Sequence, residues 1–131
     1  MTLTYLWRGP VDNAALNALH AEGFGGPVGR IDWRERLQRH SLGWVCATEG
    51  EQLVGFVNVA WDGGAHAFVL DTVTARRVRS RGVGAALVGT AAEGARAAGC
   101  AWLHVDFEED LRPFYVDACG FRGTAAGLLA L

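Results

Sequence analysis

The sequence predicts a single α/β domain in which helices flank a mixed, mostly antiparallel central sheet. Segments with helical periodicity alternate with valine-rich and aromatic segments along the 131 residues, as in a layered α/β fold. Three strand-like segments follow one another through tight glycine turns, which favour antiparallel pairing. One further strand-like segment follows a helical crossover, so it should lie parallel to the strand before that crossover.

The N-terminal third is predicted to contain a strand and two helices. Residues 3–7 read as a short strand, and apolar residues at helical spacing predict a first helix over residues 11–22. A second helix is expected over residues 32–40, with Asp32 as its N-terminal cap. The glycine-rich loop of residues 24–30 between these helices is expected to form a mobile rim that contacts a ligand.

The centre of the chain is predicted to fold as an antiparallel meander. Its three segments are rich in valine and aromatic residues, and they span residues 44–48, 53–61 and 65–74. Two short glycine-containing sequences separate these segments, and each suits a hairpin turn. The last strand leads directly into a basic, glycine-containing stretch.

The C-terminal half is predicted to continue with a helix, a strand and a second helix. Val83, Leu87, Ala91 and Ala95 recur on one face of a helix that stops at Gly99. Most of these side chains are small, so that face should pack closely on a sheet. The expected order is completed by a strand over residues 102–107, a short helix over residues 112–118 and one or two closing strands within residues 121–131.

Composition and charge exclude several classes of protein. The 12 basic residues, all arginine, face 14 acidic ones, and the net charge of -2 argues against a nucleic-acid partner. The three cysteines show no metal-ligand spacing, so no metal site is expected. No apolar run approaches the ~20 residues of a membrane span and no signal-peptide pattern is present, so we expect a cytoplasmic protein without a membrane partner. No repeat or linker divides residues 1–131, which should form one domain.

A basic, glycine-containing turn is the clearest functional signal in the chain. The first amides of a helix lack partners, the helix dipole is positive there, and glycines let the backbone approach an anion. A dinucleotide fingerprint is excluded because Leu87 replaces the third glycine, and a P-loop is excluded because the chain has no lysine. The phosphate-binding turn predicted here reads Arg79-Ser80-Arg81-Gly82-Val83-Gly84-Ala85.

A second motif, Phe-Tyr-Val-Asp-Ala-Cys-Gly-Phe, occupies residues 114–121. The turn at residues 79–84 reads Arg-x-x-Gly-x-Gly, and the strand over residues 68–73 leads into it. In this order the features resemble the GNAT superfamily of acetyl-CoA-dependent N-acetyltransferases, whose motifs are (Gln/Arg)-x-x-Gly-x-(Gly/Ala) and Phe-Tyr-x-x-x-Gly-Phe. The second motif here holds one extra residue before its glycine. The resemblance covers residues 43–122 well and the first 42 residues by topology only.

The resemblance implies acetyl-CoA as the cosubstrate and a mixed sheet of the GNAT type. Tyr115 would protonate the departing thiolate, which a phenol with a pKa near 10 can do in a dry pocket. A backbone amide at Val73 would polarise the thioester carbonyl, and residues 70–73 would lie beside the pantetheine arm. Backbone amides and the guanidinium groups of Arg79 or Arg81 would bind the pyrophosphate. The implied cosubstrate contacts are Val73, Arg79, Ser80, Arg81, Gly82, Val83, Gly84 and Ala85.

The acceptor side requires a proton acceptor, because an alkylammonium must become neutral before it attacks. Among the carboxylates of residues 71 and 106–109, Asp71 is the preferred candidate. It is expected to share one strand face with Val69 and Val73, so that its carboxylate points toward the thioester contact. The alternative is that Asp71 pairs with a nearby arginine.

Glu108 and Trp33 are candidate contacts for the acceptor. Glu108 replaces an asparagine common in the family, so that residue's role does not transfer to it. It belongs to the acidic stretch of residues 106–110, which would attract a cationic amine or would simply be a solvated loop that balances Arg112. Trp33 follows the glycine-rich loop and could line an acceptor pocket or belong to the core.

The function predicted from these features is transfer of an acetyl group from acetyl-CoA to a primary amine. The acceptor would be a small molecule, or else a protein, and it would attack directly within a ternary complex. The alternative is a non-catalytic module of the same fold that senses CoA or serves as a scaffold. A homodimer is implied by the resemblance alone.

Overall fold

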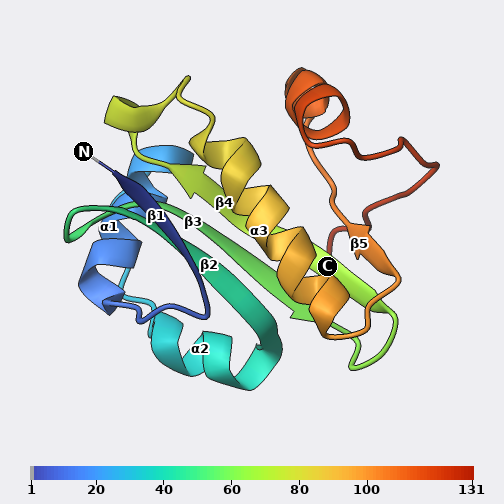
Figure 1. Ribbon diagram of the computed structural model, residues 1–131, viewed down its shortest axis with the longest axis horizontal. Coiled ribbons are helices and arrows are strands. Elements are labelled where there is room, and N and C mark those ends of the chain that lie inside the picture. Colours follow the sequence, from blue (N-terminus) through green and yellow to red (C-terminus); the bar gives the residue numbers. More distant parts are fainter. Residues whose placement is uncertain (1) are drawn as a thin grey trace.

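One five-stranded sheet organises the fold (Figure 1). The computed structural model describes residues 2–131, and it confirms the α/β class and the mixed sheet. The first four strands are antiparallel neighbours in sequence order, and the fifth pairs parallel with the fourth, as predicted for a strand after a crossover. The strands are β1 (Leu3–Trp7), β2 (Ser41–Glu49), β3 (Gln52–Trp61), β4 (His66–Thr74) and β5 (Trp102–His104).

Helices cover both faces of this sheet. The helices α1 (Asn13–Phe24) and α2 (Trp33–His40) lie on one face, where Trp33 packs against Phe56 of β3 with ring centroids 5.8 Å apart. The helix α3 (Val83–Ala97) lies on the other face, where Leu87 meets Gly55, the neighbour of Phe56. Successive residues of a strand point to opposite faces, so these two contacts fix the layers. Figure 1 shows α3 crossing in front of the strands.

The close packing predicted for α3 is confirmed at its contact with Trp7. A Cβ atom at Gly94 would lie 2.6 Å from atoms of the Trp7 ring, so only a residue without a side chain fits there. The apolar residues of α3 complete a core formed mainly by β2 and β3. Its largest fully buried side chains are Trp33, Phe56, Leu16, Leu37 and Leu87.

The link between α1 and α2 is held from inside by the buried Asn17. Its Oδ1 accepts hydrogen bonds from Ile31 N (3.2 Å) and Trp33 Nε1 (3.1 Å), and its Nδ2 donates to the carbonyl oxygens of Asn13 and Ile31. The predicted cap of α2 is confirmed, because Asp32 accepts from Glu35 N at 3.2 Å. These bonds fix where α2 begins beneath the glycine-rich loop.

The C-terminal segment departs from the prediction. The strand β5 ends at His104 instead of residue 107, and residues 121–131 form no strand, so the expected closing strands are wrong. Only Phe121 of this tail packs on the core, and the following residues are mostly alanine, glycine and leucine, which form strands poorly without a buried face.

The predicted last helix is a π-helix, Pro113–Ala118. Cys119 N donates to the carbonyl oxygen of Phe114, five residues earlier, as this wider helix requires. Short 3₁₀ turns occupy Arg76–Val78 and Glu109–Leu111. Within residues 2–131, no helix combines the length and the apolar character that crossing a membrane requires.

Replacing Asn17 by alanine should destabilise the protein markedly. The change leaves Ile31 N and Trp33 Nε1 without acceptors, and we expect it to lower the free energy of unfolding by at least about 2 kcal/mol. Urea denaturation followed by tryptophan fluorescence measures this difference. The control is Gln38→Ala on the exposed face of α2, and an equal loss in both variants would contradict the role given to Asn17.

Candidate active site

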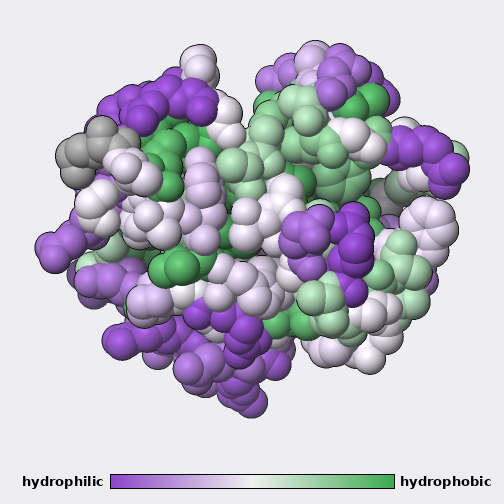
Figure 2. Space-filling model, viewed as in Figure 1, coloured by the Kyte–Doolittle hydropathy of each residue, from purple (hydrophilic) through white to green (hydrophobic). Residues whose placement is uncertain are grey.

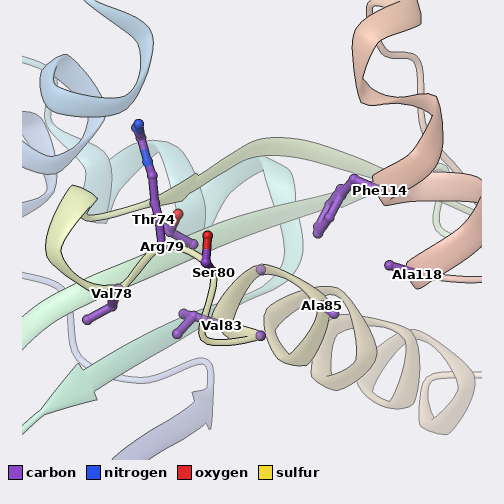
Figure 3. A pocket seen from close by; sticks show the side chains of 10 residues that line it. Thr74, Val78, Arg79, Ser80, Val83, Ala85, Phe114 and Ala118 are labelled. Atoms are coloured by element: carbon purple, nitrogen blue, oxygen red, sulfur yellow. The ribbon is translucent and has the colours of Figure 1, made fainter.

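A cavity of about 300 Å³ opens at the N-terminus of α3, where the phosphate-binding turn was predicted (Figure 3). Ser80 and Gly82 have φ angles of 65° and 78°, and Gly82 is the residue from which α3 begins. This left-handed backbone presents the unpaired first amides of α3 at the positive end of its dipole. The space-filling view shows a notch between the basic turn and the last helix (Figure 2). The cavity is lined by Thr74, Val78, Arg79, Ser80, Gly82, Val83, Gly84, Ala85, Phe114 and Ala118.

The turn and the tyrosine motif meet at Gly84. A Cβ atom there would lie 3.0 Å from the Phe114 ring, so the absence of a side chain lets the π-helix pack against the start of α3. Phe114 in turn contacts Tyr115, with ring centroids 4.8 Å apart. The two motifs recognised in the sequence therefore form one continuous site.

The arginines of the turn have different partners. Arg77 and Arg81 donate to the carboxylate of Glu49 at 2.5 Å and 3.1 Å, and Glu49 is only 7% exposed. Hydrogen bonding from Arg77 lowers the pKa of Glu49 below its ordinary value, although burial opposes this shift. Arg79 forms no ion pair within residues 2–131, and its side chain extends outward from the turn (Figure 3). Of the two arginines predicted to add charge near a phosphate, Arg79 is thus the unpaired one.

An extra residue interrupts β4 beside this cavity. Leu70 is opposite Asn58 and Val73 is opposite Phe56, so three steps along β4 match two steps along β3. Such a bulge breaks the alternation of side chains. Asp71 and Thr72 are left without partners on β3, and Asp71 adopts a φ of 57°.

This bulge corrects the prediction that Val69, Asp71 and Val73 share one face. Val69 is paired with Val59, which shares the α3 face of β3 with Gly55, whereas the side chain of Val73 contacts Gly23 of α1 on the opposite face. Val73 is also paired with β3, so the strand positions whose backbone lacks a partner residue are Asp71 and Thr72.

Asp71 pairs with a histidine of α1, and the predicted arginine partner is wrong. Its Oδ1 lies 3.2 Å from Nε2 of His20, and the two side chains are 28% and 29% exposed. The His20 ring lies against Phe24 and Trp33, with centroids 4.5 Å and 5.4 Å away. One signal for His20 was available from the sequence, namely its position one helical turn after the buried Leu16.

Trp33 belongs to the core and does not line a pocket. Its side chain is fully buried, its Nε1 donates to Oδ1 of Asn17, and its ring packs against the ring of His20. The expectation that it contacts an acceptor directly is therefore wrong. The residue at the end of α1 that does reach the surface beside His20 is Phe24, which is 57% exposed.

Tyr115 is buried where the π-helix faces the bulge of β4. Its ring stacks on Phe107 at 5.1 Å and meets Phe121 at 5.9 Å. Burial raises the pKa of Tyr115 above its ordinary value, and the neighbouring Thr72 side chain offsets part of this shift. The Thr72 hydroxyl is buried and has no well-formed hydrogen bond within residues 2–131. A phenol in this position stays protonated well above neutral pH and can act as a proton donor.

A groove of about 1340 Å³ extends from this point between α3, β4, β5 and the C-terminal segment. It begins where β4 and β5 part after a ladder of only three residue pairs. Asp106, Glu109 and Arg112 line it, and Arg112 neutralises Glu109 through two hydrogen bonds of 2.9 Å and 2.6 Å. Glu108 is exposed and lies outside the lining, so the structure does not bring it into the site as predicted.

Comparison with known proteins identifies the family. Residues 13–121 match the sequence model of the acetyltransferase (GNAT) family, from the start of α1 to the residue that packs on Tyr115. The chain belongs to this family of acetyltransferases. No curated protein sequence matches the chain significantly.

Solved structures share the fold over nearly their whole length. An acetyltransferase from Trypanosoma brucei superposes with a TM-score of 0.81 at 21% identity, covering 99% of this chain and 100% of that one. Glucosamine-6-phosphate N-acetyltransferase from Arabidopsis thaliana gives 0.77 at 15% identity, covering 98% of each chain. AAC(6')-Iy, solved with the bisubstrate analogue CoA-S-monomethyl-acetylneamine, gives 0.77 at 17% identity, covering 100% of this chain and 98% of that one.

Replacing Glu49 by glutamine should weaken the acid dependence of stability. A carboxylate whose pKa is lowered in the folded state stabilises the fold above its unfolded pKa, and this contribution is lost as the pH falls through the folded pKa. We expect Glu49→Gln to melt at a lower temperature than wild type at pH 7 and to lose less on acidification below about pH 4.5. Thermal melts across this range measure both effects. Glu35→Gln, which removes an exposed carboxylate on α2, is the control, and parallel curves for Glu49→Gln and wild type would contradict the prediction.

Proposed function

We propose that residues 1–131 form one N-acetyltransferase domain that transfers an acetyl group from acetyl-CoA to a primary amine. The observation that carries the proposal is the contact between the anion-binding turn and the tyrosine motif, made through Gly84 and Phe114. It brings a site for a pyrophosphate and a buried proton donor to the same end of β4. The acceptor is a small-molecule amine, and a protein amine is the second choice.

Acetyl-CoA is held by the backbone of the turn and by strand β4. The amides from Ser80 to Ala85 bind the pyrophosphate, and Arg79 adds the charge that Arg81 shares with Glu49. The pantetheine arm pairs with the exposed backbone of residues 70–72. The amides of Asp71 and Thr72 polarise the thioester carbonyl, in place of Val73, because the bulge leaves these two positions without partners on β3.

The reaction is a direct attack of the amine on the acetyl carbon. A nitrogen–carbon bond forms, the carbon–sulfur bond breaks, and Tyr115 donates its proton to the departing thiolate. Asp71 accepts the proton that the ammonium loses, and His20 holds its carboxylate in place. A covalent acetyl-enzyme is disfavoured at Cys119, because burial raises the pKa of that thiol and so suppresses the reactive thiolate.

The test follows the release of CoA thiol from acetyl-CoA in the presence of a panel of primary amines. Amine-dependent release supports the proposal. Tight CoA binding without release from any amine would instead support the non-catalytic sensing module.

Replacing Arg79 by glutamine should weaken CoA binding by about tenfold, the scale of one lost charge-assisted hydrogen bond. Isothermal titration calorimetry with CoA measures the change. Arg39→Gln removes the same charge from the exposed face of α2 and should leave the affinity unchanged. An identical affinity in the Arg79 variant would remove this side chain from the phosphate site.

Replacing Tyr115 by phenylalanine should lower kcat by about 100-fold and leave CoA affinity unchanged, because only the proton donor is lost. In the wild type, activity should persist to a pH above 10, since the pKa of Tyr115 is raised above that ordinary value. Thiol release against pH measures both effects. Tyr5→Phe, on the strand at the far edge of the sheet, is the control. A Tyr115 variant as fast as this control would show that another group protonates the thiolate.

A further inference from the structure

The side of β4 that faces away from α3 carries an exposed apolar strip beside Asp71. Phe68 and Leu70 lie opposite Ala60 and Asn58 of β3. These two residues of β3 point to the same face of the sheet as Phe56, which is the face covered by α1 and α2. These helices stop short of the strip, so Phe68 is 38% exposed and Leu70 is 42% exposed.

The neighbouring strand β5 extends this strip. His104 is paired with Phe68 and stacks on its ring at a centroid distance of 4.7 Å. Trp102, two residues earlier on the same face, is 57% exposed. We use the name apolar strip for Phe68, Leu70, Trp102 and His104. All four also line the groove that opens where β4 and β5 part, so the strip continues into the candidate active site.

Asp71 places a carboxylate at the end of the strip. Asp71 follows Leu70 directly, its Oδ1 is engaged by His20, and its Oδ2 has no hydrogen-bond partner within residues 2–131. Two arginines line the groove: Arg112 is neutralised by Glu109, whereas Arg122 forms no ion pair within residues 2–131 and belongs to the C-terminal segment, not to the strip. The titratable side chain that α1 presents to Asp71 is His20, and α2 presents the apolar ring of Trp33 beneath it.

We propose that the acceptor is a primary amine with a single positive charge and a flat apolar body, such as an arylalkylamine. This inference rests on the proposed function, in which the donor occupies the α3 side of β4 and the acceptor therefore approaches from the opposite side. The ammonium binds Asp71 through Oδ2, and the apolar body lies along Leu70 and Phe68, which span about 7 Å of strand.

The same features disfavour other amines. A polyamine or aminoglycoside needs several carboxylates. The apolar strip contains none, and the groove beside it adds Asp106 alone, because Glu109 is paired with Arg112. A phosphorylated amino sugar or an amino acid needs a cation for its own anionic group. The strip offers only His104, which is engaged by the Nδ1 atom of His66 at 2.7 Å, so such a substrate would have to reach Arg122 on the C-terminal segment.

The experiment compares 2-phenylethylamine with ethylamine, spermidine and glucosamine 6-phosphate. We expect kcat/KM for 2-phenylethylamine to exceed that of each other amine by about tenfold or more, the scale of partial burial of a phenyl ring. Calorimetry of 2-phenylethylamine with the CoA-saturated protein gives a readout that does not depend on turnover. Absence of binding there, or equal use of the four amines, would overturn the inference.

Two variants locate the body of the acceptor. Phe68→Ala should raise KM for 2-phenylethylamine about fivefold and leave KM for ethylamine unchanged. Trp61→Ala is the matched control, because Trp61 is 37% exposed on the opposite face of the sheet and its loss should change KM for neither amine.

Phe68→Asp adds a second carboxylate and should shift the preference toward 1,6-diaminohexane. Equal changes for both amines in Phe68→Ala, with no shift in Phe68→Asp, would overturn the inference while amine-dependent thiol release still supported the proposed function.

Discussion

The extra residue in β4 is the constraint on which the candidate site depends. In a regular antiparallel strand, residues 71 and 72 would point to opposite faces and each would lie opposite a residue of β3. The bulge instead frees both residues from the ladder, turns the Asp71 carboxylate toward His20 and leaves Thr72 beside Tyr115. The proposed proton acceptor, Asp71, and the proposed proton donor, Tyr115, therefore lie on either side of the same interruption in β4. Helix α1 meets the bulge through His20, and the tyrosine motif meets it through Tyr115.

Local rules were sufficient for most of the fold. The meander follows from the chemistry of its turns, and the cap at Asp32 follows from a short acidic side chain beside free amides. The parallel placement of β5 follows from the helical crossover that precedes it. The prediction of closing strands after Phe121 was wrong because a strand needs a partner strand and a buried face, and the composition of a segment indicates neither. Sequence patterning describes what a segment can form alone and is weakest where pairing decides the outcome.

The site was predictable only where its chemistry is local. The turn at residues 79–85 would bind an anion through its own backbone, so its composition alone was sufficient to propose it. Which arginines of the turn are paired depends on Glu49, which lies 28 residues before Arg77 in the chain. His20 and Asp71 are 51 residues apart, and the bulge that joins them has no signature in a pattern of alternating polarity. Trp33 was ambiguous because an aromatic residue after a loop suits a rim and a core equally well.

The π-helix shows how a motif can change its length without changing its geometry. In an α-helix, one added residue would rotate everything after it by about 100° and carry Phe121 away from Tyr115. Here the ladder lengthens to a five-residue step between Phe114 and Cys119, and the rings of Tyr115 and Phe121 still meet. The insertion is therefore absorbed within a single turn, and the spacing written in a sequence signature is a weaker constraint than the ring contact it encodes. Relatives that carry such a turn would escape any search that requires a fixed number of residues between the tyrosine and the glycine.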